Sequence, residues 1–189
     1  MSVTTVVLDA AGLPWTEVTM PSSSSPVQLA RLHSDRTTKA SVSLVRFPPG
    51  WSRPGTGHYT CAEEFVVLEG EISVSGSVST AGAHTYLPSL TSRTASFAGA
   101  EGCLAVAWFS GPPVWRDGVA PEGPDPAEVG DTVLLESVTE APGSLSTDDT
   151  AGFDVLFVEE RTWVYVPAGE PFPDLPGRVL VRRWARSGA

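Results

Sequence analysis

The stretch from residue 50 to residue 58, Gly-Trp-Ser-Arg-Pro-Gly-Thr-Gly-His, decides the fold together with Glu63 and Gly70. His58 is followed after four residues by Glu63, and Glu63 is followed after six residues by Gly70. Successive side chains of a β-strand point to opposite faces. We therefore expect His58 to end one strand and Glu63 to begin the next after a short connection. The glycines suit tight corners between such strands.

A second stretch, Gly82-Ala-His-Thr-Tyr-Leu-Pro88, follows after a short gap and leads to Arg93. The two stretches resemble, in order and spacing, the two sequence motifs of the cupins. Thr56 stands where the first motif has the first histidine of His-x-His. In the second motif Leu90 stands in the glycine position and Arg93 in the histidine position.

The resemblance covers about residues 40–110 and implies an all-β fold: a cupin barrel, also called a double-stranded β-helix or jelly-roll. The short gap and the run Glu64–Gly70 resemble short-loop cupins related to the cupin domain of the anti-sigma factor ChrR. Such cupins commonly pair through edge strands, so the resemblance also implies a homodimer.

The rest of the chain supports an all-β class, because short Val-, Leu-, Phe-, Trp- and Thr-rich runs alternate with Gly and Pro. We expect residues 1–112 to form the barrel. Residues 113–189 are expected to hold a connection and a second, reduced cupin-like β unit. In that unit the run Tyr165–Phe172 fits the end of the second cupin motif, with Phe172 in the histidine place; an ordinary Pro-Gly turn is the alternative.

Charge and hydropathy exclude several partners. The net charge is −10 and Arg182, Arg183 and Arg186 form only a small basic cluster, so we expect no nucleic-acid partner. No apolar run is long enough to cross a membrane, and no signal peptide is recognisable. We expect a cytoplasmic protein whose two cysteines, Cys61 and Cys103, are free thiols.

The ligand set for a metal is incomplete. In most cupins three imidazoles and one carboxylate hold Fe, Mn, Ni or Zn. The resemblance carries over only His58 and Glu63, with His84 as a possible third ligand. Arg93 cannot coordinate a cation, since its guanidinium stays protonated. We therefore expect no cofactor, and a divalent metal is the alternative.

The leading hypothesis is an enzyme that isomerises, cyclises or eliminates on a small organic substrate without a metal. His58 and Glu63 would transfer protons and Arg93 would stabilise developing negative charge. The substrate-binding residues would be an aromatic and polar set: Trp51, Thr56, Tyr59, Tyr86 and Trp108. Three alternatives stay open: a metal-dependent dioxygenase, a non-catalytic binding or sensor protein, and a dead site plugged by an Arg93–Glu63 ion pair.

Overall fold

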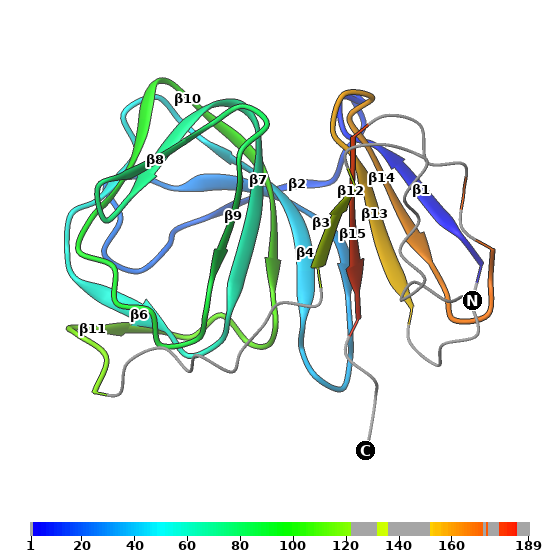
Figure 1. The fold of residues 1–189 in the computed structure, drawn as a ribbon. Helices are drawn as coiled ribbons and strands as arrows, with labels where there is room; N and C mark the ends of the chain where they lie inside the picture. The colour runs from blue at the N-terminus through cyan, green and yellow to red at the C-terminus, as the bar shows by residue number, and fades with distance from the viewer. Residues whose placement is uncertain (1, 122–131, 136–151, 172, 174–177, 185–189) are drawn as a thin grey trace. The chain divides into compact units, whose positions relative to one another are not determined.

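The computed structural model describes residues 2–121, 132–135, 152–171, 173 and 178–184. These residues form strands, turns and loops, with no helix among them, so the predicted all-β class is confirmed. The chain divides into two compact units (Figure 1). The larger is Leu13–Gly130, and the smaller combines Met1–Gly12 with Asp131–Ala189.

The larger unit contains the motif residues and is built on an eight-stranded sheet whose strands curl around an interior (Figure 1). The sheet has the order β2-β3-β4-β10-β7-β8, with β5 added to β10 and β9 added to β7. A separate ribbon pairs β11 with β6. The strands are β2 (Trp15–Val18), β3 (Val27–Ser34), β4 (Ser41–Phe47), β5 (Ser52–Arg53), β6 (Gly57–Tyr59), β7 (Glu63–Val74), β8 (Ser77–Thr80), β9 (His84–Leu87), β10 (Ser96–Phe109) and β11 (Trp115–Asp117).

The long antiparallel pair of β7 and β10 forms the middle of this sheet. The pairing register shifts twice, between Ala98 and Cys103 and between Leu104 and Ala105. At the first shift Gly70 and Gly102 have φ angles of +67° and +81°, which L side chains rarely adopt. Residues 63–74, on both sides of Gly70, therefore form one bent strand, β7.

The interior of the larger unit is an apolar cluster of side chains from four neighbouring strands and from the loop before β5. Its buried members are Val27, Val45, Trp51, Phe65, Val67, Ile72, Ala98, Cys103, Ala105 and Ala107. Alternate residues of β7 and β10 supply most of it, as the period-2 pattern of strands requires. This cluster is the floor on which the polar site is built.

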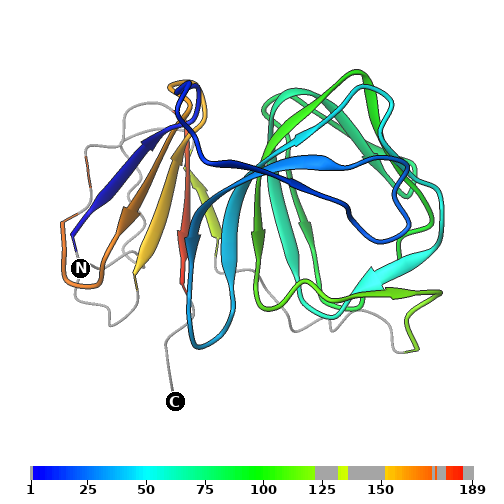
Figure 2. The same ribbon diagram turned by 180° about the vertical axis from the view of Figure 1, so that it is seen from behind.

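The smaller unit is a five-stranded antiparallel sheet in the order β1-β14-β13-β15-β12. Its core consists of Phe153, Val155, Phe157, Val164, Val166, Val179 and Val181. The strands are β1 (Thr4–Val7), β12 (Thr132–Leu135), β13 (Phe153–Phe157), β14 (Thr162–Val166) and β15 (Val179–Arg183). Figure 2 shows β1 beside β14, its partner in the register Thr4 to Tyr165.

The domain boundaries differ from those expected. We predicted that residues 1–112 form one barrel, but β1 completes the edge of the smaller sheet because its backbone pairs with β14. The expected connection after residue 112 contains β11, which pairs with β6 in the larger unit. The run Tyr165–Phe172 was predicted to fit the end of the second cupin motif. In it Gly169 has a φ of +80° and Glu170 N–H donates to Pro167 O, whereas Phe172 lies outside the described residues.

β3 (Val27–Ser34) pairs with β2 on one side and with β4 on the other. Among the residues placed by the structure, no helix is long and apolar enough to cross a membrane.

Candidate functional site

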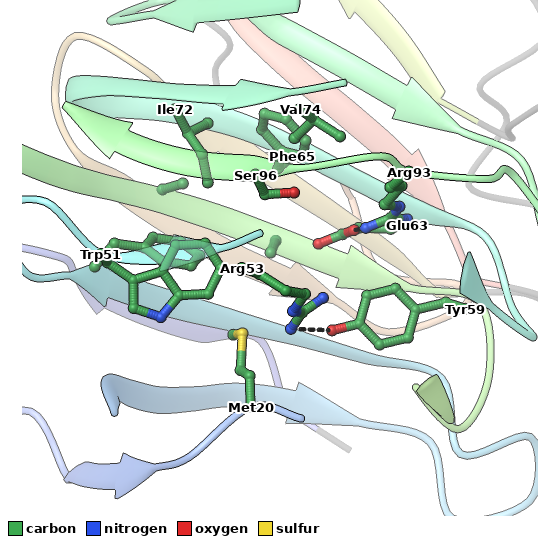
Figure 3. Close-up of a pocket in the computed structure, with 13 residues that line it drawn as sticks. Met20, Trp51, Arg53, Tyr59, Glu63, Phe65, Ile72, Val74, Arg93 and Ser96 are labelled. Carbon is green, nitrogen blue, oxygen red and sulfur yellow. Dashed lines mark hydrogen bonds and ion pairs between the residues drawn. The ribbon is translucent and has the colours of Figure 1, made fainter. Parts of the chain in front are cut away.

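One cavity opens in the larger unit, between the curled strands (Figure 3). Most of its wall is apolar, and its polar groups gather at one end. It has about 40 Å³ of room for solvent, enough for a few water molecules. Its lining residues are Met20, Phe47, Trp51, Arg53, Tyr59, Glu63, Phe65, Ile72, Val74, Arg93, Ser96, Ala105 and Ala107.

Strand alternation decides which motif residues reach this cavity. Trp51, Arg53 and Tyr59 line it. Ser52 of β5 and His58 of β6 each come directly before one of these residues, so their side chains point to the other face. Beyond the next turn, Glu63 and Phe65 continue the inward set on β7. The predicted site residues Trp51, Tyr59, Glu63 and Arg93 are thus brought together.

Glu63 and Arg93 form an ion pair at the polar end of the cavity, between Glu63 Oε2 and Arg93 Nη1. The side chains are 15% and 5% exposed, so the pair is largely shielded from solvent. The Arg93 backbone is fixed by two hydrogen bonds with Gly57, N–H to O in both directions at 2.8 and 3.0 Å. Arg93 therefore occupies the position of the missing histidine and neutralises the carboxylate that remains.

Arg53 is a second buried guanidinium in the same wall, and sequence analysis missed it. It lies on β5 opposite Ser96 of β10, it is 3% exposed, and its Nη2 donates to Tyr59 Oη at 3.2 Å (Figure 3). Its Cζ lies 4.1 Å from the centroid of the Trp115 ring. The Trp-x-Arg pattern of Trp51 and Arg53, at the start of the first motif, was the available signal, since residues two apart in extended chain share a face.

Trp115 reaches Arg53 because Gly57 leaves room for it. A Cβ on Gly57 would lie 2.1 Å from Trp115 Cζ2, so any larger residue would push the indole away. Trp115 also makes an edge contact with Tyr59, with ring centroids 5.1 Å apart. The strand hidden in the Pro- and Gly-rich connection thus closes one side of the site.

Tyr59 lies among the charged groups. Arg93 Cζ is 4.8 Å from the Tyr59 ring centroid and Arg53 Cζ is 5.5 Å from it. Burial raises the pKa of the Tyr59 phenol and the negative charge of Glu63 raises it further, while the two arginines oppose the shift. The phenol is accordingly protonated at neutral pH, and with Arg53 donating to its oxygen, its own O–H is available as a donor.

His58 and Thr56 are not brought to the cavity. The His58 ring lies on the face of β6 opposite Tyr59, where Nδ1 is 3.1 Å from Gly118 O. Thr56 lies in the turn before β6 and its backbone oxygen accepts from Gly118 N–H. The predicted acid/base pairing of His58 with Glu63 is therefore not formed, because the inward phase of this strand belongs to Tyr59.

Tyr86, Trp108 and His84 also face away from the cavity. In the register of the sheet, Glu64 is opposite Tyr86 on one side and Trp108 on the other, and Glu64 alternates with the inward Glu63. His84 Nε2 lies 2.5 Å from Glu64 Oε1, which identifies its partner on that outer face. The expected third imidazole thus lies on the face opposite the cavity.

Leu90, which stands in the glycine position of the motif, has a backbone conformation that glycine favours. Its φ is +59°, and its N–H donates to Tyr59 O at 3.0 Å. A left-handed backbone costs a non-glycine residue roughly 1–2 kcal/mol. The turn that leads to Arg93 is therefore kept by its hydrogen bonds in spite of this strain.

The residues present do not fit a cupin metal. The four ligand positions hold Thr56, His58, Glu63 and Arg93, of which Glu63 is the one metal-binding type that faces the cavity. The guanidinium paired with Glu63 would repel a cation. Across the described residues, no group of three or more His, Cys, Asp or Glu side chains is placed to hold a metal ion.

The two cysteines are buried free thiols in the structure, as predicted. Burial raises the pKa of Cys61 to about 11 and that of Cys103 to about 12. At pH 8 only about one Cys61 thiol in a thousand is then the reactive thiolate.

We expect dithionitrobenzoate to label the native protein far more slowly than the urea-unfolded protein, with the rate rising up to pH 11. Equal rates in both states would show that Cys61 is accessible and ionised.

Comparison with known proteins agrees with this fold. A family model described as the ChrR cupin-like domain matches residues 3–110. The chain belongs to this ChrR cupin-like family. No curated protein matched the sequence.

Two solved structures are similar to this ChrR-like cupin at low sequence identity. A protein provisionally assigned as a dioxygenase from Nostoc punctiforme is 14% identical with a TM-score of 0.72, over 97% of this chain and 82% of that chain. The polyketide cyclase RemF from Streptomyces resistomycificus is 17% identical with a TM-score of 0.47, over 60% of this chain and 84% of that chain. The likeness to the Nostoc protein concerns the fold alone.

Proposed function

We propose that this cupin is an enzyme that moves a proton on a small, largely apolar organic molecule without a metal, as an isomerase, cyclase or lyase. The observation that carries the proposal is the grouping of Glu63, Arg93 and Tyr59 at the polar end of an apolar cavity. A carboxylate, a fixed cation and a protonated phenol are the groups that proton abstraction beside a carbonyl requires.

In the proposed step the Glu63 carboxylate takes a proton from the carbon next to a carbonyl group, and the C–H electron pair forms an enolate. The Tyr59 O–H donates to the enolate oxygen, and Arg53, which donates to the same phenol oxygen, favours that polarisation. Return of the proton from Glu63 to another carbon gives an isomer. Attack of the enolate carbon on a second carbonyl closes a ring, and the Glu63 proton passes to the new alkoxide. In elimination the enolate electrons expel a β-leaving group, which takes the Glu63 proton. His58 has no part in this scheme.

The proposal is tested by hydrogen exchange on methyl ketones in D2O, followed by 1H NMR. The panel is acetophenone, 4-acetylbenzoate and pyruvate. We expect the protein to accelerate exchange of at least one of them, and Glu63→Gln to reduce that acceleration by roughly 100-fold or more. Tyr59→Phe is expected to weaken it as well.

His58→Ala is the matched control, because it removes an ionisable side chain of the motif, and this side chain faces away from the cavity. Its exchange rate should equal that of the wild type. Wild-type rates at the buffer background for the whole panel, or loss of exchange in His58→Ala with Glu63→Gln still active, would contradict the assignment.

A non-catalytic binding protein is the second candidate, and the ion pair favours it. Arg93 already occupies one lone pair of the only carboxylate in the cavity wall, and the free space is small. Under this alternative the wild-type protein does not accelerate hydrogen exchange, and Glu63→Gln changes only the affinity for the ligand. The exchange panel separates the two candidates, since only the enzyme accelerates exchange.

We also propose that the protein forms a homodimer. In the eight-stranded sheet the end strands are β2 and β8, and unpaired strand edges are ready partners for another copy. Val78 on β8 is 61% exposed. Light scattering of the purified protein gives the mass, and a monomer at all concentrations would rule out the dimer.

A further inference from the structure

We infer that the cavity takes a small, largely apolar monocarboxylate, and that Arg53 is the residue that binds its carboxylate group. The inference deepens the proposed function in that it takes the same cavity as the site. It assigns the charge of the ligand and the residue that selects it.

The charges of the lining residues are not balanced. Arg53 and Arg93 contribute two positive charges and Glu63 one negative charge, which leaves a net charge of +1; the other lining residues are neutral. Arg93 is neutralised by Glu63. Among the residues that the structure describes, no carboxylate pairs with Arg53.

A buried guanidinium without a counter-charge is an uncommon arrangement, because removing an ion from water is unfavourable unless an opposite charge or full hydrogen bonding compensates. Arg53 is 3% exposed, and its Nε is buried with no hydrogen-bond partner in the described structure. Its compensation consists of one hydrogen bond to Tyr59 and contacts with aromatic rings. The Arg53 guanidinium thus has five N–H donors and few acceptors to receive them.

A carboxylate supplies what is missing. It brings the single negative charge that makes the cavity neutral, and its two oxygens match the forked donors of a guanidinium. The remaining wall fits an apolar body, since Trp51, Phe65, Ile72 and their neighbours surround it (Figure 3). A dianion such as a phosphate would leave the cavity negatively charged, so we assign a monoanion.

A purely structural Arg53 makes an opposite prediction about stability. If its contacts with Trp115 and Tyr59 hold the fold together, then Arg53→Met must lower the thermal midpoint. If Arg53 is held ready for an anion, then Arg53→Met removes an uncompensated buried charge and leaves the midpoint of the ligand-free protein unchanged or higher.

The experiment is a 19F NMR titration with two isosteric pairs of probes, trifluoroacetate against trifluoroacetamide and 4-fluorobenzoate against 4-fluorobenzamide. The two sizes allow for the narrow cavity. We expect at least one anion to bind at least tenfold more tightly than its amide. Arg53→Met should abolish that preference with no loss in thermal midpoint, and Arg53→Lys should restore part of it.

Arg46→Met is the control, because Arg46 is an exposed arginine of the same unit and should leave the preference intact. Equal affinity for anion and amide in both pairs, no binding of either anion, or a preference that survives Arg53→Met would overturn the inference. These results concern charge selection only. The proposed proton transfer would stand or fall separately, on the deuterium exchange of the neutral ketone acetophenone.

Discussion

Replacement of Arg93 by methionine is expected to lower the free energy of unfolding by about 2–4 kcal/mol. The variant leaves the Glu63 carboxylate in an apolar wall without its cation, and the Glu63 side chain is only 15% exposed. Urea unfolding of the larger unit, followed by tryptophan fluorescence, measures the change.

Two controls make this result specific. Adding Glu63→Gln to Arg93→Met removes the stranded charge, and the double variant should regain at least half of the lost stability. Arg46→Met, on the exposed surface, should change the free energy by no more than about 1 kcal/mol. A loss in Arg93→Met no larger than in Arg46→Met would show that the ion pair contributes nothing.

Replacement of Gly70 by alanine is expected to lower the free energy of unfolding of the larger unit by more than about 3 kcal/mol. The φ of Gly70 is +67°, and a Cβ there would lie 2.1 Å from Gly102 O and 3.0 Å from Gly102 C. Both contacts are with backbone, so no side chain can move aside, and the register shift between β7 and β10 would have to change.

Gly76→Ala is the matched control for this prediction. Gly76 has a φ of +84°, yet nothing lies within 4 Å of a Cβ built on it. Only the backbone strain of roughly 1–2 kcal/mol then applies. Similar losses in the two variants would mean that the close approach of Gly70 to Gly102 is unimportant.

The fold was predictable because its determinants are local. Gly50, Gly70 and Gly82 all have positive φ angles, so their spacing marks real corners of the chain. The strands over residues 41–47 and 132–135 follow from their β-branched and apolar residues. The placement of β1 was not predictable from such local signals, since its partner β14 lies more than 150 residues away, in the register Thr4 to Tyr165.

The site was only partly predictable, because the phase of a strand is not fixed by a motif with substituted ligands. A single step along β6 exchanges His58 for Tyr59 in the cavity wall. The ligand spacing of cupins placed His58 inside, but with Thr56 and Arg93 in two of the four ligand positions, nothing in the motif requires that phase. Arg53 escaped notice for a related reason, since its importance depends on Trp115, which reaches it from a segment predicted to be a connection.

We propose that Arg93 has replaced a metal ligand and that the cavity works as a metal-free site for a small carboxylate. Elemental analysis of the untagged protein, purified without chelator, tests it most directly. We predict no near-stoichiometric Fe, Mn, Ni or Zn, no gain in ketone exchange when these metals are added, and the same metal content in Glu63→Gln. Near-stoichiometric metal in the wild type that disappears in Glu63→Gln or His58→Ala would contradict the account.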